Sequence, residues 1–328
     1  MLLHGWSARF PNGEFGVDVF FALSAFLITT LLLEEIDTFG RLDFVAFYLR
    51  RVFRLAPAMV IFLTVVAVPT ALLAHEGGSI VPSSLGTVFY VNDFLIVKTS
   101  LIGSVYAHTW SLAIEEQFYA IWPFVVAVGL ARLGHAGRQV ALACALGFAV
   151  VVQAFFPLDY FLPTAHLVPL AGGALAAEWF LFGRNKFRDR VATTAIGLIV
   201  APCLFVTTML RFGNATTWVR LAVGVAAALL VLNLAIGQGG VAARVLSSSP
   251  MRWLGQRSYG LYLYHRTFAQ LIPLIWRGIT LRYAGPLVIV LSCAFAELSF
   301  RFIEQPVRER GRAWLRSTRP QPDVIKFR

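Results

Sequence analysis

The sequence predicts an all-α, polytopic integral membrane helix bundle. Hydrophobic residues make up 58% of the 328-residue chain, charged residues only 14%, and the mean hydropathy is +0.72. A soluble domain averages roughly 45–50% apolar and about 25% charged residues. Several apolar runs approach the roughly 20 residues that cross a hydrocarbon core of about 30 Å, and alternating strands of the barrel type are not evident. We therefore expect about nine membrane-spanning helices.

The predicted spans are apolar runs that end at charged residues. In chain order they cover about 16–33, 55–74, 111–131, 140–157, 164–182, 191–210, 220–237, 258–275 and 286–304. The connection 75–110 contains the run GTVFYVNDFLIV, which is too short to cross and predicts an interfacial or re-entrant segment. The spans group into a membrane-embedded domain over residues 1–304, followed by a basic cytoplasmic tail over residues 305–328.

Lysine and arginine gather in alternate connections, as the positive-inside rule requires. The first connection holds Arg41, Arg50, Arg51 and Arg54, and seven more basic residues follow Arg301 in the tail. This pattern predicts a cytoplasmic tail and an external start of the chain. The start shows no signal peptide, so we expect that a first helix is missing upstream of Met1.

The formal net charge of +11 is explained by these clusters, which orient the spans and meet anionic lipid headgroups. We expect the lipid bilayer as a partner and no nucleic acid. Cys144, Cys203 and Cys293 lie inside apolar runs without paired spacing. They predict packing residues, and no metal site is expected.

Two motifs precede or open the first two predicted spans. In GVDVFFALSAFLITTLLLEE, Asp18 begins an apolar helix, where it can cap exposed N–H groups. In FYLRRVFRLAPA, Arg50 and Arg54 share a helix face beside Arg51. Arginine binds phosphate oxygens in a bidentate fork, so these side chains could hold a ligand with several phosphates. The alternative is a positive-inside anchor.

The stretch HTWSLAIEEQFYAIWPF brings ionisable groups to the edge of the third predicted span. On a continuous helix His108, Glu115 and Tyr119 line one side. Glu116 points about 100° away, so one glutamate could face a polar cavity while the other meets the interface. Two carboxylates cannot both lie in lipid cheaply. The alternative places both in the headgroup region.

Two further motifs lie in the last two predicted spans. In WLGQRSYGLYLYHRTF, Ser258, Tyr262 and His265 form a polar stripe, which either contacts substrate or joins helices by hydrogen bonds. In FRFIEQPVRER, we expect Glu304 to pair with an arginine three residues earlier and Pro306 to end the helix.

Together these motifs resemble those of the acyltransferase-3 family of integral-membrane O-acyltransferases. The resemblance rests on four ordered stretches: GVDVFFALSAFLIT, FYLRRVFRLAPA, HTWSLAIEEQFYAIWP, and SYGLYLYH followed by FIEQPVRER. It implies ten spans and transfer of an acyl group from cytoplasmic acyl-CoA, most simply acetyl-CoA, to a hydroxyl group. The implied acceptors are sugars, glycolipids, lipid-linked sugars and glycosylated natural products, and the implied location is the cell membrane.

The resemblance also implies roles for residues. The family motif places an arginine ten residues before a histidine; His4 stands at the histidine's place, and the arginine would fall upstream of Met1. His4 would act as general base and Glu115 or Glu116 would orient it or the acceptor. Arg50, Arg51 and Arg54 would hold the donor phosphates. The residues implied to contact substrate are Asp18, His108, Trp110, Ser111, Tyr119, Tyr262 and His265.

Two alternatives stay open at this point. Intramembrane Glu, His and Arg also make the proton relays of transporters, although inverted repeats with broken helices are not evident. The other alternative is an incomplete, inactive family member in which the segment around His4 is poorly held.

Overall fold

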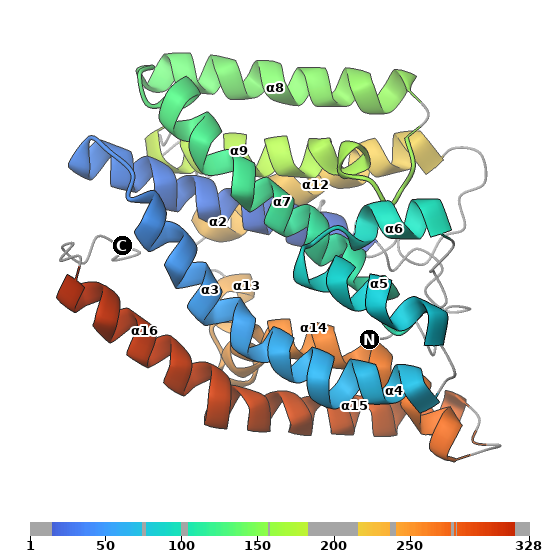
Figure 1. The fold of residues 1–328 in the computed structure, drawn as a ribbon. Coiled ribbons are helices and arrows are strands. Elements are labelled where there is room, and N and C mark those ends of the chain that lie inside the picture. Colours follow the sequence, from blue (N-terminus) through green and yellow to red (C-terminus); the bar gives the residue numbers. More distant parts are fainter. Residues whose placement is uncertain are drawn as a thin grey trace. The chain divides into compact units, whose positions relative to one another are not determined.

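The computed structural model describes residues 15–73, 77–99, 104–156, 158–182, 216–236, 241–276, 279 and 281–318. Helices account for almost all of these residues, and none of them forms a strand (Figure 1). The predicted all-α class is therefore confirmed for the described part of the chain. His4 lies outside it.

Within these ranges seven helical stretches are long and apolar enough to cross a membrane. They are Phe15–Phe39, Phe44–Leu73, Ala107–Leu130, His135–Phe155, Pro163–Phe182, Thr217–Ile236 and Ala284–Thr318. Each overlaps one predicted span, which confirms seven of the nine. The predicted span 191–210 lies outside the described residues. The predicted span 258–275 forms part of helix α14 (Ser249–Ile275), which is more polar than the seven.

Helix α3 (Phe44–Ile61) begins well before the apolar run that predicted it. The Asp43 side chain accepts a hydrogen bond of 2.9 Å from the backbone N–H of Ala46 and so caps the helix. Arg50, Arg51 and Arg54 consequently lie on the helix, as the predicted common face of Arg50 and Arg54 requires, and the helix begins before the predicted boundary at residue 55. The physical reason is that an apolar run marks only the part of a helix that lies in lipid.

Helix α15 (Leu281–Ser299) continues through the π-helical turn η7 (Phe300–Glu304) into α16 (Gln305–Thr318). The prediction that Pro306 ends the helix is wrong. Pro306 is the second residue of α16, directly after a turn whose hydrogen bonds span five residues instead of four. Where π-helical hydrogen bonding changes to α-helical hydrogen bonding, one backbone N–H can remain without a helical partner. Proline, which has no N–H, is tolerated at such a position.

The chain forms two compact units. The described residues of unit 1 fall within Asp43–Ile114 and Ser249–Arg328, and those of unit 2 fall within Ser7–Leu42 and Glu115–Ser248. The sequence predicted a different division, into a membrane-embedded domain over residues 1–304 and a cytoplasmic tail over residues 305–328. Residues 305–318 of that tail form α16, and the remainder lies outside the described ranges.

Unit 2 is organised around α9 (Leu167–Phe182). This helix packs against α2 (Phe15–Phe39), α8 (His135–Phe155) and α12 (Thr216–Ile236) (Figure 1). Small residues allow the close approach, since a Cβ atom on Gly173 would lie 2.2 Å from the carbonyl oxygen of Ala22 in α2. The surrounding apolar core contains Ala22, Phe26, Ala176, Ala177, Ala227 and Val231.

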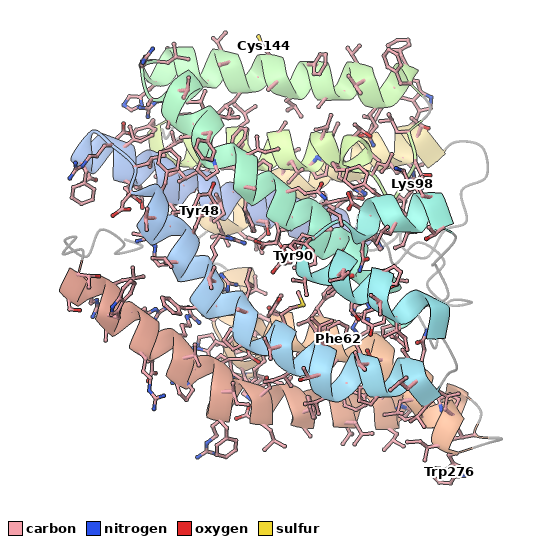
Figure 2. The ribbon with its side chains drawn as sticks, in the orientation of Figure 1. Tyr48, Phe62, Tyr90, Lys98, Cys144 and Trp276 are labelled. Carbon is pink, nitrogen blue, oxygen red and sulfur yellow. The ribbon has the colours of Figure 1, made fainter. Side chains whose placement is uncertain are left out.

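The outer face of α8 carries exposed apolar side chains, including Val140, Phe148 and Phe155. Cys144 lies on this face with its sulfur atom directed outward (Figure 2), so its predicted packing role is wrong. In a membrane protein a lipid-facing helix is apolar on its outside too, and the sequence does not separate the two environments. Cys293 is half-buried, and Cys203 lies outside the described residues.

The longer helices of unit 1 pack in two pairs. Helix α14 packs against α15, and α16 lies along α3 (Figure 1). The α3–α16 contact is tight, because a Cβ atom on Gly311 of α16 would lie 2.4 Å from the Phe53 ring of α3. The Phe53 and Trp314 rings also meet edge-on, with their centroids 6.3 Å apart. The core of the unit includes Ala58, Met59, Phe62, Val66, Leu263, Tyr264 and Ala296.

The connection after the second span contains two short helices in unit 1, α5 (Gly77–Val88) and α6 (Asn92–Thr99). Both are too short to cross a bilayer, as predicted. The buried Asn92 amide donates hydrogen bonds to the hydroxyl oxygens of Thr87 at 2.6 Å and Thr109 at 2.7 Å. These bonds tie both short helices to the segment that carries His108.

Candidate functional site

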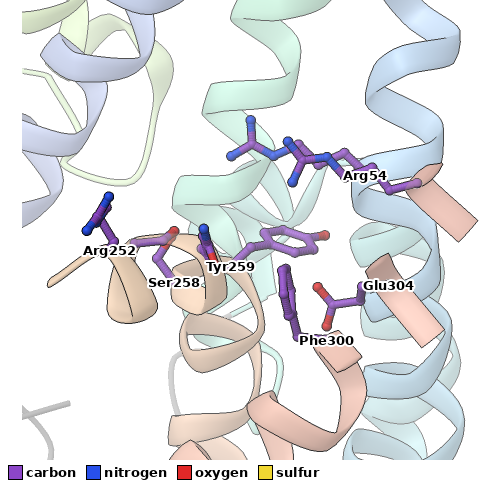
Figure 3. A pocket seen from close by; sticks show the side chains of 9 residues that line it. Arg54, Arg252, Ser258, Tyr259, Phe300 and Glu304 are labelled. Atoms are coloured by element: carbon purple, nitrogen blue, oxygen red, sulfur yellow. The ribbon is translucent and has the colours of Figure 1, made fainter. Parts of the chain in front are cut away.

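A cavity of about 310 Å³ opens in unit 1 among α3, α14, η7 and α16 (Figure 3). Its lining residues are Arg54, Arg252, Gly255, Gln256, Ser258, Tyr259, Phe300, Glu304 and Arg308. Arg54 comes from α3, Arg252 from the first turn of α14, and Arg308 from α16. Residues from three segments far apart in sequence thus meet at one opening.

The cavity carries an excess of positive charge. Three arginines and one carboxylate line it, and in the described part of the chain Arg54, Arg252 and Arg308 take no part in an ion pair. Guanidinium groups without carboxylate partners bind phosphate oxygens strongly, because each presents a planar fork of N–H donors. The arrangement therefore suits an anionic ligand.

Glu304 is the buried acidic group of this cavity. It accepts a hydrogen bond from the Ser299 hydroxyl, which also lies 2.9 Å from the Tyr264 hydroxyl. The five-residue separation of Ser299 and Glu304 matches the π-helical turn between them. The predicted pairing of Glu304 with Arg301 is wrong, because this turn rotates the carboxylate toward the cavity. Figure 3 shows it beside Phe300 and Tyr259.

The three arginines predicted to hold phosphates have different positions. Arg54 lines the cavity, whereas Arg50 and Arg51 do not. Arg51 instead lies over the Phe47 ring, 6.0 Å from its centroid. Arg252 and Arg308 were not predicted to hold phosphates. Their only sequence signal was membership of basic clusters at the same predicted face of the membrane as Arg54.

A second polar cluster in unit 1 joins two motifs that lie about 150 residues apart. The Tyr262 hydroxyl donates to the His108 carbonyl oxygen and contacts the Ser111 hydroxyl. His108 Nε2 donates to the Leu263 carbonyl oxygen at 3.0 Å, and His265 Nδ1 donates to the Tyr262 carbonyl oxygen at 2.7 Å. A carbonyl only accepts, so these bonds fix which ring nitrogens carry hydrogen.

The two imidazoles of this cluster lie edge-on, with ring centroids 5.5 Å apart, and both side chains are buried. His108 lies in the 3-10 turn η3 (Ala107–Thr109), which leads directly into α7 (Trp110–Val125). Trp110 is buried at the start of α7. Four of the residues predicted to contact substrate, His108, Ser111, Tyr262 and His265, are therefore in one cluster.

Helix α14 connects the cavity to this histidine–tyrosine cluster. Tyr259 lines the cavity, and His265 lies six residues further along the same helix, about 9 Å at 1.5 Å per residue. A flexible ligand whose phosphates bind the arginines would therefore need an arm of about 9 Å to reach the histidine–tyrosine cluster.

The two predicted glutamates have different environments in unit 2. Glu115 is buried and accepts hydrogen bonds from Tyr119 on the next turn of α7 and from Ser24 of α2. Glu116 is half-buried. The sequence predicted that His108, Glu115 and Tyr119 line one side of a helix. The contact between Glu115 and Tyr119 is present. His108 precedes α7 and belongs to unit 1.

The different environments predict different effects of removing each charge. We expect Glu115→Gln to destabilise the protein by about 1–3 kcal/mol, because it weakens two buried charge-assisted hydrogen bonds. We expect Glu116→Gln, at a half-buried carboxylate, to destabilise the protein less than Glu115→Gln does. Thermal unfolding in one detergent measures both. Equal shifts in the two variants would contradict the assignment of Glu115 as the buried acceptor.

Asp18 has a partner that the sequence did not reveal. It lies in the first turn of α2, and its Oδ1 is 2.7 Å from Nδ1 of His166, which heads α9. His166 Nε2 donates to the Tyr160 carbonyl oxygen at 2.9 Å. The side chains of Asp18 and His166 are almost fully buried. The available signal was only that a buried aspartate on an apolar helix needs a partner.

No group of three or more His, Cys, Asp or Glu side chains that could hold a metal ion occurs within the ranges that the structure describes. The donors offered by the cavity and the cluster are guanidinium, hydroxyl and imidazole groups. They suit an organic anion and a hydroxyl-bearing substrate.

Comparison with known proteins adds an independent line of evidence. A family model described as an acyltransferase domain matches residues 2–298. The provisionally named peptidoglycan O-acetyltransferase YrhL of Bacillus subtilis (strain 168) is 32% identical over 333 residues, covering 92% of this chain and 52% of its own length. O-acetyltransferase OatA of Staphylococcus aureus (strain NCTC 8325 / PS 47) is 29% identical over 339 residues, covering 95% and 55%.

Peptidoglycan O-acetyltransferase OatA of Listeria monocytogenes serovar 1/2a is 29% identical over 332 residues, covering 92% of this chain and 52% of its own length. The chain thus spans about half the length of the curated relatives it matches. No solved structure shows a significant match.

Proposed function

Because the chain belongs to the acyltransferase-3 family, we propose that it is an O-acyltransferase that acts on a hydroxyl group of a cell-envelope sugar. The observation that carries the proposal is the family match over nearly the whole chain. The seven apolar helices make it a multi-pass protein of the cell membrane. The names of the relatives support acetyl as the acyl group and peptidoglycan as the acceptor.

We propose acyl-CoA as the donor. Its phosphates would bind Arg54, Arg252 and Arg308 at the cavity, because these are the guanidinium groups that converge there. Arg50 and Arg51 would contribute a more distant attraction from the same stretch of α3. The acyl-bearing arm would follow α14 past Tyr262 toward His265, which lies about 9 Å along the helix from the cavity residue Tyr259.

The proposed reaction needs one base and no external proton source. His4, at the histidine position of the family motif, would take the proton of the acceptor hydroxyl. The acceptor oxygen then bonds to the thioester carbonyl carbon, the carbon–sulfur bond breaks, and the leaving thiolate takes from protonated His4 the proton that came from the acceptor hydroxyl. The net proton change is zero.

Other residues would assist in this proposal. His108, Trp110, Ser111, Tyr262 and His265 would form the wall that contacts the acyl group or the acceptor. In unit 2, Asp18 and Tyr119 remain proposed substrate contacts, and Glu115 and Glu116 remain the proposed groups that orient base or acceptor.

The proposal predicts that His4→Ala abolishes acyl transfer without affecting membrane insertion. Membranes that contain the protein are incubated with acetyl-labelled acetyl-CoA and, separately, peptidoglycan fragments, a lipid-linked sugar or a glycosylated small molecule. The parent should label one acceptor class. His4→Ala should lower the rate at least about 100-fold, because general base catalysis contributes roughly 10²–10⁴-fold.

The matched control is His135→Ala, which removes a half-exposed imidazole that is in neither the cavity nor the cluster. It should retain the parental rate. Labelling by the parent and by His4→Ala at equal rates would exclude His4 as the base. No labelling of any acceptor by the parent, with a correctly inserted protein, would count against the acyltransferase proposal as a whole.

A further inference from the structure

The last membrane-crossing stretch, Ala284–Thr318, is longer than a bilayer requires. Its 35 residues span about 52 Å at 1.5 Å per residue, whereas the hydrocarbon core is about 30 Å thick. The apolar part ends near Arg301, at the end predicted to be cytoplasmic. The segment from there onward, including α16, must therefore lie in the headgroup layer and beyond it.

This end of unit 1 is strongly basic. From the described residues it contains ten arginines and four carboxylates, an excess of six positive charges. The arginines are Arg50, Arg51, Arg54, Arg252, Arg257, Arg301, Arg308, Arg310, Arg312 and Arg316. The carboxylates are Asp43, Glu297, Glu304 and Glu309.

The carboxylates do little to neutralise the arginines of the α15–α16 segment. Glu297 is engaged by Arg257, with a weaker attraction to Arg301. Glu304 accepts a hydrogen bond from Ser299 inside the cavity, and Glu309 accepts one of 2.8 Å from Gln305. Arg301, Arg310 and Arg312 are exposed, whereas Arg308 faces the cavity.

Packing against α3 holds α16, the helix that carries Arg310 and Arg312, in place. Gly311 and Leu315 bury one side of α16, with Gly311 pressed against Phe53 of α3. Trp314 contacts the same Phe53 ring edge-on and leaves 49% of its surface exposed. A tryptophan with one apolar side packed and the other open is typical of the membrane interface.

We propose that Arg301, Arg310 and Arg312, with Trp314, form a binding site for anionic phospholipid headgroups of the inner leaflet. The charge is complementary, and the bilayer is always adjacent because α16 continues from the membrane-crossing α15. Attraction fades over a Debye length of roughly 8–10 Å. Arg316, further along the helix, should therefore contribute less than the other three.

The site is tested by lipid retention. The full chain is reconstituted in nanodiscs containing phosphatidylcholine and phosphatidylglycerol, and the phosphatidylglycerol that stays bound after detergent extraction is measured by native mass spectrometry. We expect the triple variant Arg301→Gln/Arg310→Gln/Arg312→Gln to bind it at least about tenfold more weakly, since each nearby arginine contributes about fivefold. The variant Arg316→Gln should differ from the parent by less than about threefold.

The matched control is Arg41→Gln/Arg132→Gln/Arg244→Gln, which removes the same charge from three exposed arginines elsewhere at the predicted cytoplasmic face. It should retain phosphatidylglycerol as the parent does. Circular dichroism and a monodisperse elution profile establish that each variant is folded. Equal retention by parent and triple variant, or an equal loss in the control, would overturn the site. Neither measurement depends on acyl transfer.

Discussion

Replacing Arg54 by glutamine is expected to raise the KM for acyl-CoA by about 10-fold to 100-fold. Arg54 lines the cavity from α3, and within the described ranges no carboxylate pairs with its guanidinium group. A hydrogen bond to a charged group contributes about 1.5–3 kcal/mol, and 1.4 kcal/mol corresponds to a factor of ten. Initial rates against acetyl-CoA concentration, at saturating acceptor, measure the effect.

Arg50→Gln provides the matched control for Arg54→Gln. It removes the same charge from the same helix one turn earlier, at a residue that does not line the cavity. Its effect on KM should stay below about threefold, as expected for a distant screened charge. Arg54→Lys should recover only part of the affinity, because an ammonium group cannot form the bidentate fork.

Two results would contradict this assignment. If Arg50→Gln and Arg54→Gln raise the KM equally, the arginines act as a diffuse charge and the cavity does not hold the phosphates. If neither raises it and both lower the amount of inserted protein, the stretch is a topological anchor. A selective effect of Arg54→Gln on KM with unchanged insertion excludes both.

The spans could be predicted because each is decided by local composition. A helix in lipid must be apolar over roughly 20 residues, so its signal is contained in its own sequence. Boundaries were less accurate at α3 and α16, where helices continue beyond the hydrocarbon. In water a helix is held by caps such as Asp43 and by packing such as Gly311 on Phe53, and hydropathy reports neither.

The site could be predicted only in part, for a different reason. The polar stripe of α14 and the HTWS stretch were each identified from the sequence, but their pairing was not. Tyr262 meets His108 and Ser111 across 154 and 151 residues, and Asp18 meets His166 across 148. Such pairs depend on how helices pack, which a single sequence does not specify.

The cavity illustrates a third limit. Arg252 and Arg308 carry the same local signal as other basic residues that face solvent, and only the packing of α14 and α16 separates them. The π-helical turn at Phe300–Glu304 likewise lacks a sequence signature, yet it determines that Glu304 faces the cavity. A one-residue shift in helix register changes which face a side chain occupies.

Replacing Gly173 by alanine is expected to destabilise the protein by about 3 kcal/mol. The added methyl group would lie 2.2 Å from the carbonyl oxygen of Ala22 and 3.1 Å from its Cα. These are backbone atoms of α2, so no side chain can rotate away and the two helices must separate. Overpacking in a core typically costs about 1–3 kcal/mol, and a rigid neighbour places this case at the upper end.

Gly147→Ala tests the same substitution in a helix with open space. Gly147 lies on α8, where an added Cβ meets nothing within 4 Å. Alanine favours helix by about 1 kcal/mol over glycine, so this variant should be as stable as the parent or slightly more stable. Fluorescence-detected elution after heating compares the three proteins. An unchanged midpoint for Gly173→Ala would mean that α2 and α9 are not in backbone contact, and the packing of unit 2 would need to be redrawn.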